Sequence, residues 1–229
     1  MRFSRLENLI GQEQLSLLKD KKVIVFGLGG VGSFVAEALV RSGIGQVDVV
    51  DYDKIDESNI NRQIIALENT VGEFKTDVFQ ARARLINPDL KIHTYREKVS
   101  KENIKEIIIE SYDYVLDCID DVQGKLALAS FCQETDQSFM LALGFANKFH
   151  PEMIEISTLK HTSVCPLAKA MRKQFRDHGL SLSIPCVYSK EKPAKVLDQS
   201  ILGSTAFCPS TAGLMMASFV INSFVKEID

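Results

Sequence analysis

The sequence of 229 residues has no closely spaced pair of cysteines and no excess of positive charge. A structural zinc site requires closely spaced ligand pairs, whereas the five cysteines here stand far apart, at positions 118, 132, 165, 186 and 208. We therefore expect no zinc, and free cysteines in a reducing, cytoplasmic compartment. The 27 Lys and Arg are outnumbered by 30 Asp and Glu, so a nucleic acid would have to meet a local basic patch.

Long apolar segments are also missing. The first residues, Met1 to Arg5, are not followed by the apolar region of a signal peptide. The late apolar stretch 214–225 contains Ser218, Asn222 and Ser223 and is too short to span a bilayer. The sequence also shows no internal repeat or low-complexity tract. We expect one domain without a membrane partner.

Strand and helix patterns alternate through the first 145 residues. Apolar runs predict strands at 22–26, 47–51, 91–95, 113–118 and 138–143. Between them we expect helices at 33–42 and 70–86 and two that start near Ser100 and Val122; Thr70 and Glu73 have capping-box spacing. This alternation predicts an α/β fold, namely a Rossmann-like, doubly wound and mainly parallel sheet.

The pattern is looser after residue 145. It predicts a strand at 153–157, a helix at 166–178, a loop rich in Lys and Pro, and a final helix at 210–225. We therefore divide the single domain into an N-terminal helix at 1–20, a nucleotide-binding core at 21–145 and a C-terminal extension at 146–229.

A glycine cluster follows the first predicted strand and precedes the first core helix. Glycine allows a positive φ and a close approach to a ligand, and the helix start offers free N–H groups to an anion. The glycines of this G-x-G-G-x-G pattern are Gly27, Gly29, Gly30 and Gly32. The loop predicts binding of nucleotide phosphates; a purely structural turn is the alternative.

The residues after the second strand favour ATP over NAD. Asp51 ends that strand, where a carboxylate can bind ribose hydroxyls of either nucleotide. An enzyme that splits phosphates additionally needs cations for the phosphates and a carboxylate for Mg²⁺. The chain supplies such an inventory in Asn59, Arg62, Lys75 and Asp120. Taken alone, Lys75 fits a solvated helix lysine better than a site residue, and only the neighbouring motifs favour a function; Asp117 alone fits a helix cap equally well.

The same residues resemble the E1-like activating (ThiF/MoeB/HesA) family. The resemblance rests on the glycine loop, on Asp51 and Asp53, on S-N-x-N-R-Q at 58–63, on Lys75 and on D-C-x-D at 117–120. It implies that ATP binds at the four glycines and at Asp51, Asp53, Asn59, Arg62, Gln63 and Lys75, with Asp120 holding Mg²⁺. It also implies a homodimer in which Arg5, from the motif at 3–5, completes the partner's site; the catalytic set is then Arg5, Arg62, Lys75 and Asp120.

Four further stretches resemble the tRNA threonylcarbamoyladenosine dehydratases within that family. They are 5–11, 61–67, 114–121 and 186–191. The resemblance implies ATP-dependent cyclisation, through an acyl-adenylate, of N6-threonylcarbamoyladenosine at position 37 of tRNA. The alternative is adenylation of the C-terminal carboxylate of a ubiquitin-like sulfur-carrier protein, although its activators usually carry the Cys pairs missing here. A non-catalytic or NAD-binding protein is a third interpretation, and a sulfur-relay partner and the role of Cys186 stay open.

One basic helical face stands out in the predicted extension. Lys169, Arg172, Lys173 and Arg176 have the spacing i, i+3, i+4 and i+7, which places them on one side of a helix. Residues 145–200 hold nine Lys or Arg against five acids. A solvated face is the plain interpretation, but the local charge favours contacts with the tRNA backbone.

Overall fold

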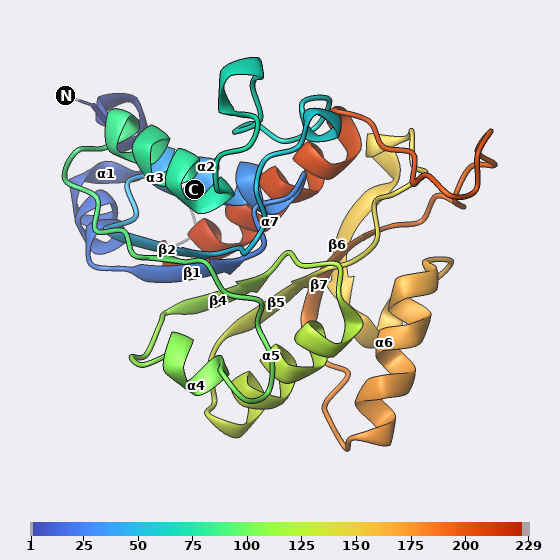
Figure 1. Ribbon diagram of the computed structural model, residues 1–229. Coiled ribbons are helices and arrows are strands. Elements are labelled where there is room, and N and C mark those ends of the chain that lie inside the picture. Colours follow the sequence, from blue (N-terminus) through green and yellow to red (C-terminus); the bar gives the residue numbers. More distant parts are fainter. Residues whose placement is uncertain (1, 226–229) are drawn as a thin grey trace.

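The computed structural model describes residues 2–225, which are organised around a seven-stranded sheet (Figure 1). The strand order is β3-β2-β1-β4-β5-β7-β6, and every neighbouring pair is parallel except β6 and β7. The strands are β1 Lys22–Phe26, β2 Gln46–Val50, β3 Thr94–Tyr95, β4 Tyr114–Asp117, β5 Phe139–Ala142, β6 Ile154–Thr158 and β7 Pro185–Ser189. The strand order reverses between β1 and β4, which confirms the doubly wound α/β prediction and creates a crevice at the carboxyl ends of these strands.

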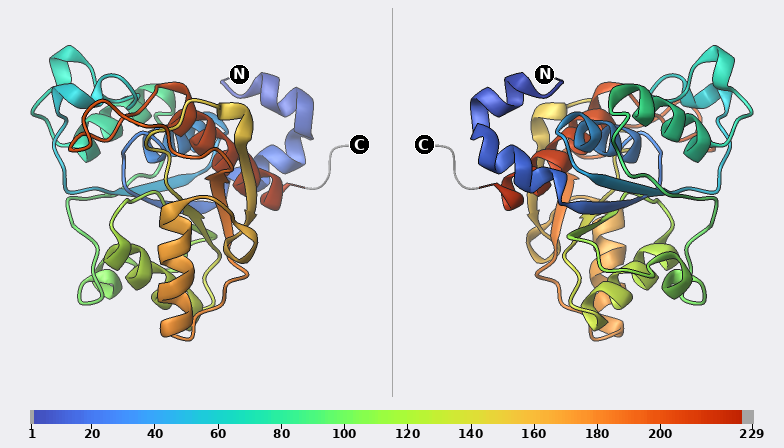
Figure 2. Two further views of the ribbon diagram at one scale, coloured as in Figure 1. Left: turned by 90° about the vertical axis from the view of Figure 1, so that its right-hand side faces the viewer. Right: turned by 90° about the vertical axis from the view of Figure 1, so that its left-hand side faces the viewer.

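Helices cover both faces of the sheet, and Figure 2 shows these layers from two other sides. One face carries α1 Ser4–Lys19, α2 Gly32–Arg41, α3 Lys75–Ile86 and α7 Phe207–Phe224. The other carries α4 Ile104–Ile107, α5 Val122–Glu134 and α6 Pro166–Asp177. Two hydrophobic cores result, one on each side of the sheet. The strands β2, β4 and β5 are buried throughout. This explains the almost continuous apolar sequences of β4 and β5, whereas β2 carries the buried Gln46, which donates to the Asp48 carboxylate at 2.9 Å.

The last helix returns from the extension to the glycine loop. A methyl group added at Gly213 of α7 would lie 2.5 Å from the carbonyl oxygen of Val31, so α7 can approach the start of α2 only because this residue is glycine. Among residues 2–225, α7 is the one helix long and apolar enough to cross a membrane. Its residues Cys208, Ala212 and Met216 are nevertheless fully buried in the core.

The helix predicted at 70–86 begins five residues late, at Lys75, and the expected capping box is absent. Instead, the Thr70 hydroxyl accepts the Leu67 N–H at 2.9 Å within a short 3₁₀ turn, η2 (Glu68–Thr70). The N–H of Ile55 donates to the carbonyl oxygen of Glu73 at 2.8 Å, and Gly72 has a φ of 89°. These contacts with a distant loop hold 72–74 out of the helix.

Three more predictions need correction. The strand expected at 91–95 is reduced to Thr94–Tyr95, and the helix expected from Ser100 is the single turn Ile104–Ile107. Residues 185–189, interpreted from sequence as part of a loop, form β7 and insert between β5 and β6. The remaining predicted strands and helices occur, with ends shifted by up to three residues. The N-terminal helix is present but kinked at Gly11, whose φ is 82°.

Candidate functional site

A cleft of about 690 Å³ opens at the carboxyl ends of β1, β2, β4 and β5. Much of its wall comes from the glycine loop and from residues within 50–63, 118–121 and 142–146. Most of the predicted cofactor and catalytic residues lie in these walls or beside them: Gly27, Gly29, Gly30, Asp51, Asp53, Asn59, Arg62, Gln63, Lys75 and Asp120. The strand ends thus bring together side chains that lie almost a hundred positions apart.

Glycine is required at the positions of this loop for different structural reasons. A methyl group at Gly29 would meet no atom within 4 Å, so this residue leaves open space for a ligand in the cleft. Gly27 has a φ of 88° and passes close to the carbonyl oxygen of Cys118. Gly32 does not line the cleft; its Cβ would lie 1.8 Å from the carbonyl oxygen of Gly27. Gly32 is therefore required for packing, and α2 begins there with its positive end towards the loop.

Asp51 directly follows β2 and joins the ends of two strands. Its carboxylate accepts the N–H of Leu28, beyond the end of β1, at 2.6 Å and that of Asp53 at 2.8 Å. The ammonium of Lys75 lies 2.8 Å from the Asp53 carboxylate and 3.8 Å from that of Asp51. Asp51 and Lys75 are both buried; burial raises the pKa of the Asp51 carboxyl, and the Lys75 charge opposes that rise. The structure thus places a lysine charge beside two carboxylates in the cleft.

A short 3₁₀ turn, η1 (Glu57–Asn59), presents the polar residues of S-N-x-N-R-Q. The turn is held by a capping box in which the N–H of Asp56 donates to Asn59 Oδ1 at 3.2 Å. The guanidinium of Arg62 donates to the carbonyl oxygen of Ser58 at 2.7 Å, which orients the side chain along the cleft wall. Gln63 Oε1 is buried and has no hydrogen-bond partner among the described residues. An acceptor in this state fits a ligand that brings a donor.

The two carboxylates of the D-C-x-D segment differ: that of Asp117 is buried and that of Asp120 is accessible. Asp117 is fully buried, and Lys125 donates to its Oδ1 at 3.0 Å and to the carbonyl oxygen of Ala142 at 2.7 Å. Burial raises the pKa of the Asp117 carboxyl. Asp120 is accessible in the cleft. The helix cap considered for Asp117 belongs to Asp121, whose carboxylate accepts the Gly124 N–H at 2.7 Å. Sequence reasoning missed Lys125, which stands inside an apolar helix.

The accessible carboxylates make one part of the cleft acidic. The charge of Asp53, with burial and with Asp120, raises the pKa of the Tyr52 hydroxyl beside them. Carboxylate oxygens are the ligands that Mg²⁺ prefers, usually one or two of them together with substrate phosphates. Asp120, which lines the same cleft as Asp53, fits such an ion.

Other predicted residues lie outside the cleft. Arg5 is exposed on the first turn of α1 and does not line the cleft of its own chain. Three of the four basic residues of α6, Lys169, Lys173 and Arg176, lie away from the core. The guanidinium of Arg172 instead donates to the carbonyl oxygen of Thr162 at 3.0 Å. Because Leu167 lines the cleft, α6 begins at its rim.

Sequence reasoning also missed the segment 202–204, which lines the cleft together with the glycine loop. Its irregular, Lys- and Pro-rich context carries no signal for that position.

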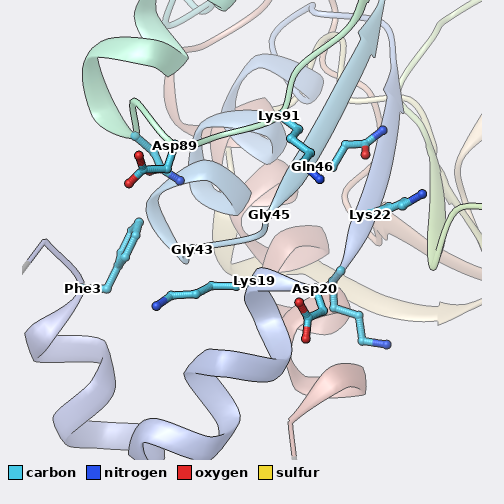
Figure 3. A pocket seen from close by; sticks show the side chains of 11 residues that line it. Phe3, Lys19, Asp20, Lys22, Gly43, Gly45, Gln46, Asp89 and Lys91 are labelled. Carbon is cyan, nitrogen blue, oxygen red and sulfur yellow. The ribbon is translucent and has the colours of Figure 1, made fainter.

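A second hollow, of about 340 Å³, lies at the opposite edge of the sheet (Figure 3). It is formed where the end of α1 meets the beginnings of β1 and β2, and Lys19, Lys22, Gln46, Asp89 and Lys91 are among its lining residues. None of the predicted site residues lies in it. Most of the predicted nucleotide-site residues therefore lie at the carboxyl edge, as expected for an open α/β sheet.

A glycine loop, cations and carboxylates at the switch point of a doubly wound sheet define a nucleotide-binding α/β protein. The chain belongs to the ThiF family, whose model matches residues 3–228. It is 36% identical over 243 residues to the tRNA threonylcarbamoyladenosine dehydratase of Bacillus subtilis (strain 168), covering 99% of this chain and 96% of that protein.

Solved structures of the Escherichia coli tRNA N6-threonylcarbamoyladenosine dehydratase TcdA agree with this membership. The complex with AMP has a TM-score of 0.93 at 32% identity, and the complex with ATP has 0.92 at 32%. Each alignment covers 97% of this chain and 93% of the other. The Drosophila willistoni adenylyltransferase and sulfurtransferase MOCS3 is 36% identical over a shorter stretch, 57% of this chain and 29% of that protein.

We predict that Lys125→Met destabilises the fold by about 3–5 kcal/mol, because it leaves the buried Asp117 charge without its partner. Urea unfolding followed by circular dichroism measures the change. The double variant Asp117→Asn/Lys125→Met carries neither charge and should lose much less stability. A single variant as stable as the unmodified chain would contradict the structural role of this pair.

Proposed function

We propose that this chain is a tRNA threonylcarbamoyladenosine dehydratase that uses ATP to cyclise N6-threonylcarbamoyladenosine at position 37 of tRNA, with net loss of water. The observation that carries the proposal is the match to the B. subtilis enzyme along nearly the full length of both chains. The cleft supports it, because it combines an open glycine loop, two cations and accessible carboxylates. The E. coli relative with this fold has been solved with ATP and with AMP.

Adenylation of a sulfur-carrier protein is the weaker candidate. The match to MOCS3 covers little more than half of this chain. The widely spaced cysteines favour the tRNA substrate as well, since the sulfur-carrier activators usually carry two Cys pairs for zinc.

The chemistry follows from the residues of the cleft. A carboxylate is a poor acyl donor, so the threonylcarbamoyl carboxylate first attacks the α-phosphate of ATP, forms an acyl-adenylate and releases pyrophosphate. Arg62 and Lys75 stabilise the charge that builds on the phosphates, and Asp51 accepts hydrogen bonds from ribose hydroxyls. Asp120 would hold Mg²⁺, which would add positive charge at the phosphates.

Ring closure needs no protein nucleophile. The attacking group and the activated carboxyl belong to one nucleoside, and the ring closes as AMP leaves and the attacking group loses its proton. Positioning therefore replaces a covalent intermediate on the enzyme. The state of two cysteine thiols is consistent with a reaction that uses no protein nucleophile. Burial raises the pKa of Cys186 to about 12 and also raises that of Cys118, which keeps both thiols protonated at neutral pH.

We expect the purified chain, given ATP, Mg²⁺ and tRNA carrying threonylcarbamoyladenosine, to release pyrophosphate and yield a nucleoside lighter by one water. Mass spectrometry of the digested tRNA checks the product. Lys75→Ala and Asp120→Ala should each lower the rate by about 10² to 10³, because each removes charge stabilisation at the phosphates. Circular dichroism checks the fold, since Lys75→Ala also leaves the carboxylates of Asp51 and Asp53 without their cation. Lys91→Ala, an exposed lysine at the opposite edge, is the control. Pyrophosphate release with a Gly-Gly-ended carrier protein but not with this tRNA would contradict the proposal.

We further propose that Arg5 acts across a homodimer. It is exposed at the start of α1 and away from the cleft of its own chain, as such a role requires. Mixing inactive Arg5→Ala and Lys75→Ala homodimers should restore activity, since one site of each heterodimer then has both residues intact. Purified heterodimers that stay inactive would show that Arg5 does not act in trans.

The outer face of α6 is proposed to contact the tRNA backbone. Changing Lys169, Lys173 and Arg176 to Glu should weaken tRNA binding and flatten its salt dependence, by a slope of about 0.7 to 0.9 for each phosphate that is no longer neutralised. ATP affinity should not change. A control with Lys19, Lys91 and Lys105 changed to Glu alters the net charge equally at exposed positions away from this helix. Equal salt slopes before and after the α6 substitutions would identify a merely solvated face.

A further inference from the structure

Two phenylalanines with no assigned role flank the cleft. Phe149 is 62% exposed and Phe207 is 40% exposed. Their rings meet edge to face, with centroids 5.1 Å apart and an interplanar angle of 90°. Phe149 follows the cleft-lining residue Ala146 by three positions, and Phe207 precedes the cleft-lining Pro209 by two. Neither ring lines the cleft itself; their contact joins the two chain segments that enter the cleft wall at Ala146 and Pro209.

The backbone under Phe149 is anchored by a buried carboxylate. Glu191 is 7% exposed, and both of its oxygens lie 3.0 Å from the N–H of Phe149 that donates to them. The N–H of His150 donates to the same carboxylate at 3.0 Å, and the buried Lys148 ammonium donates to the carbonyl oxygen of Glu191. An exposed ring on an anchored backbone is already ordered, which lowers the entropy lost when a ligand binds it.

Hydrogen bonds also hold the segment 194–204 to Asn147, two residues before Phe149. Asn147 donates its N–H to the carbonyl oxygen of Gly203 at 2.7 Å, and its own carbonyl oxygen accepts the N–H of Ala194 at 2.8 Å. Its side-chain Oδ1 also accepts the N–H of Gly203 at 2.7 Å. Lys192 and Lys195 are exposed where this segment begins. The hydrogen bond from Ala194 to Asn147 thus holds the start of this lysine-bearing segment two residues from Phe149 in the chain.

We propose that Phe149, supported by Phe207, stacks on a nucleobase next to the modified adenosine and forms a subsite for single-stranded RNA at the cleft rim. Recognition of RNA loops combines aromatic stacking on splayed bases with cations for the backbone, and both elements are present here. The exposed lysines favour a polyanion over an apolar protein surface as the occupant. The subsite rests on the proposed function, because it presumes that this adenosine enters the cleft.

The first test is the affinity for an anticodon stem-loop RNA that carries threonylcarbamoyladenosine. Phe149→Ala should raise its Kd by about 5- to 150-fold, the range for removal of one base–aromatic stack. Phe149→Tyr keeps the stacking ring and should retain the original Kd, and ATP affinity should not change in either variant. Leu85→Ala is the matched control, because it removes an apolar side chain that is 87% exposed on α3, outside the cleft.

The second test couples the ring to a base. Stem-loops with an abasic residue on the 5′ or the 3′ side of the modified adenosine are titrated against the unmodified chain and Phe149→Ala. At the stacked position, removing both the base and the ring should weaken binding no more than removing either one alone. Additive effects at both positions would overturn the proposal. So would a change in the sedimentation of Phe149→Ala without RNA, which would make the ring a subunit contact.

The proposed function and the subsite can fail separately. If the unmodified chain neither binds nor converts the modified tRNA, the proposed function fails and takes the subsite with it. If it converts the tRNA and Phe149→Ala binds the stem-loop with unchanged Kd, only the subsite is wrong.

Discussion

The cleft depends on the neutralisation of Asp51 and Asp53 by the buried ammonium of Lys75. The Asp51 carboxylate accepts a hydrogen bond from the N–H of Leu28 in the glycine loop. It therefore ties the end of β2 to the loop that follows its neighbour β1. Two carboxylates so close together, one of them buried, would repel each other without a cation between them. A buried ion pair contributes little net stability, but removal of one partner leaves a costly unpaired charge. The arrangement therefore keeps a positive charge where phosphates are proposed to bind.

A second lysine–carboxylate pair lies on the other side of the switch point and serves a different purpose. Lys125 and Asp117 are both completely buried, and the lysine also reaches the carbonyl oxygen at the end of β5. That pair fixes β4 and β5 and has no access to solvent, whereas Lys75 lines the cleft. Both pairs contain a lysine and a carboxylate, so it is access to the cleft that makes Lys75, and not Lys125, the proposed phosphate ligand.

Much of the fold and the site could be predicted because the signals are local. Buried parallel strands are mostly apolar runs, and parallel strands place their carboxyl ends at one edge, which is why Asp51 and Asp120 line the same cleft. The predicted element boundaries are wrong where contacts with residues far away in the sequence determine the local structure. The N–H of Gly72 donates to the carbonyl oxygen of Ile55, and a β-bridge joins Lys54 to Phe74, so these residues cannot begin the predicted helix.

Other features carried no local signal at all. The strand β7 is a five-residue run that starts at a proline, and its place between β5 and β6 depends on pairing with strands far upstream in the chain. The spacing of the basic residues in α6 placed them on one helical face, but it could not show that Arg172 turns to Thr162. In the same way, only the folded chain shows that Gly32 is required by the carbonyl oxygen of Gly27 rather than by a ligand.

The ammonium of Lys75 is proposed to exchange its carboxylate partners for the phosphates of ATP, and the whole mechanism depends on this exchange. A crystal structure of the chain with a non-hydrolysable ATP analogue and Mg²⁺ tests it most directly, by the distance between Lys75 Nζ and its nearest oxygens. We predict that Nζ leaves its position 2.8 Å from the Asp53 carboxylate and hydrogen-bonds a phosphate oxygen, while the phosphates lie along the glycine loop. Phosphates bound elsewhere, with Lys75 still on Asp53, would contradict the proposed exchange.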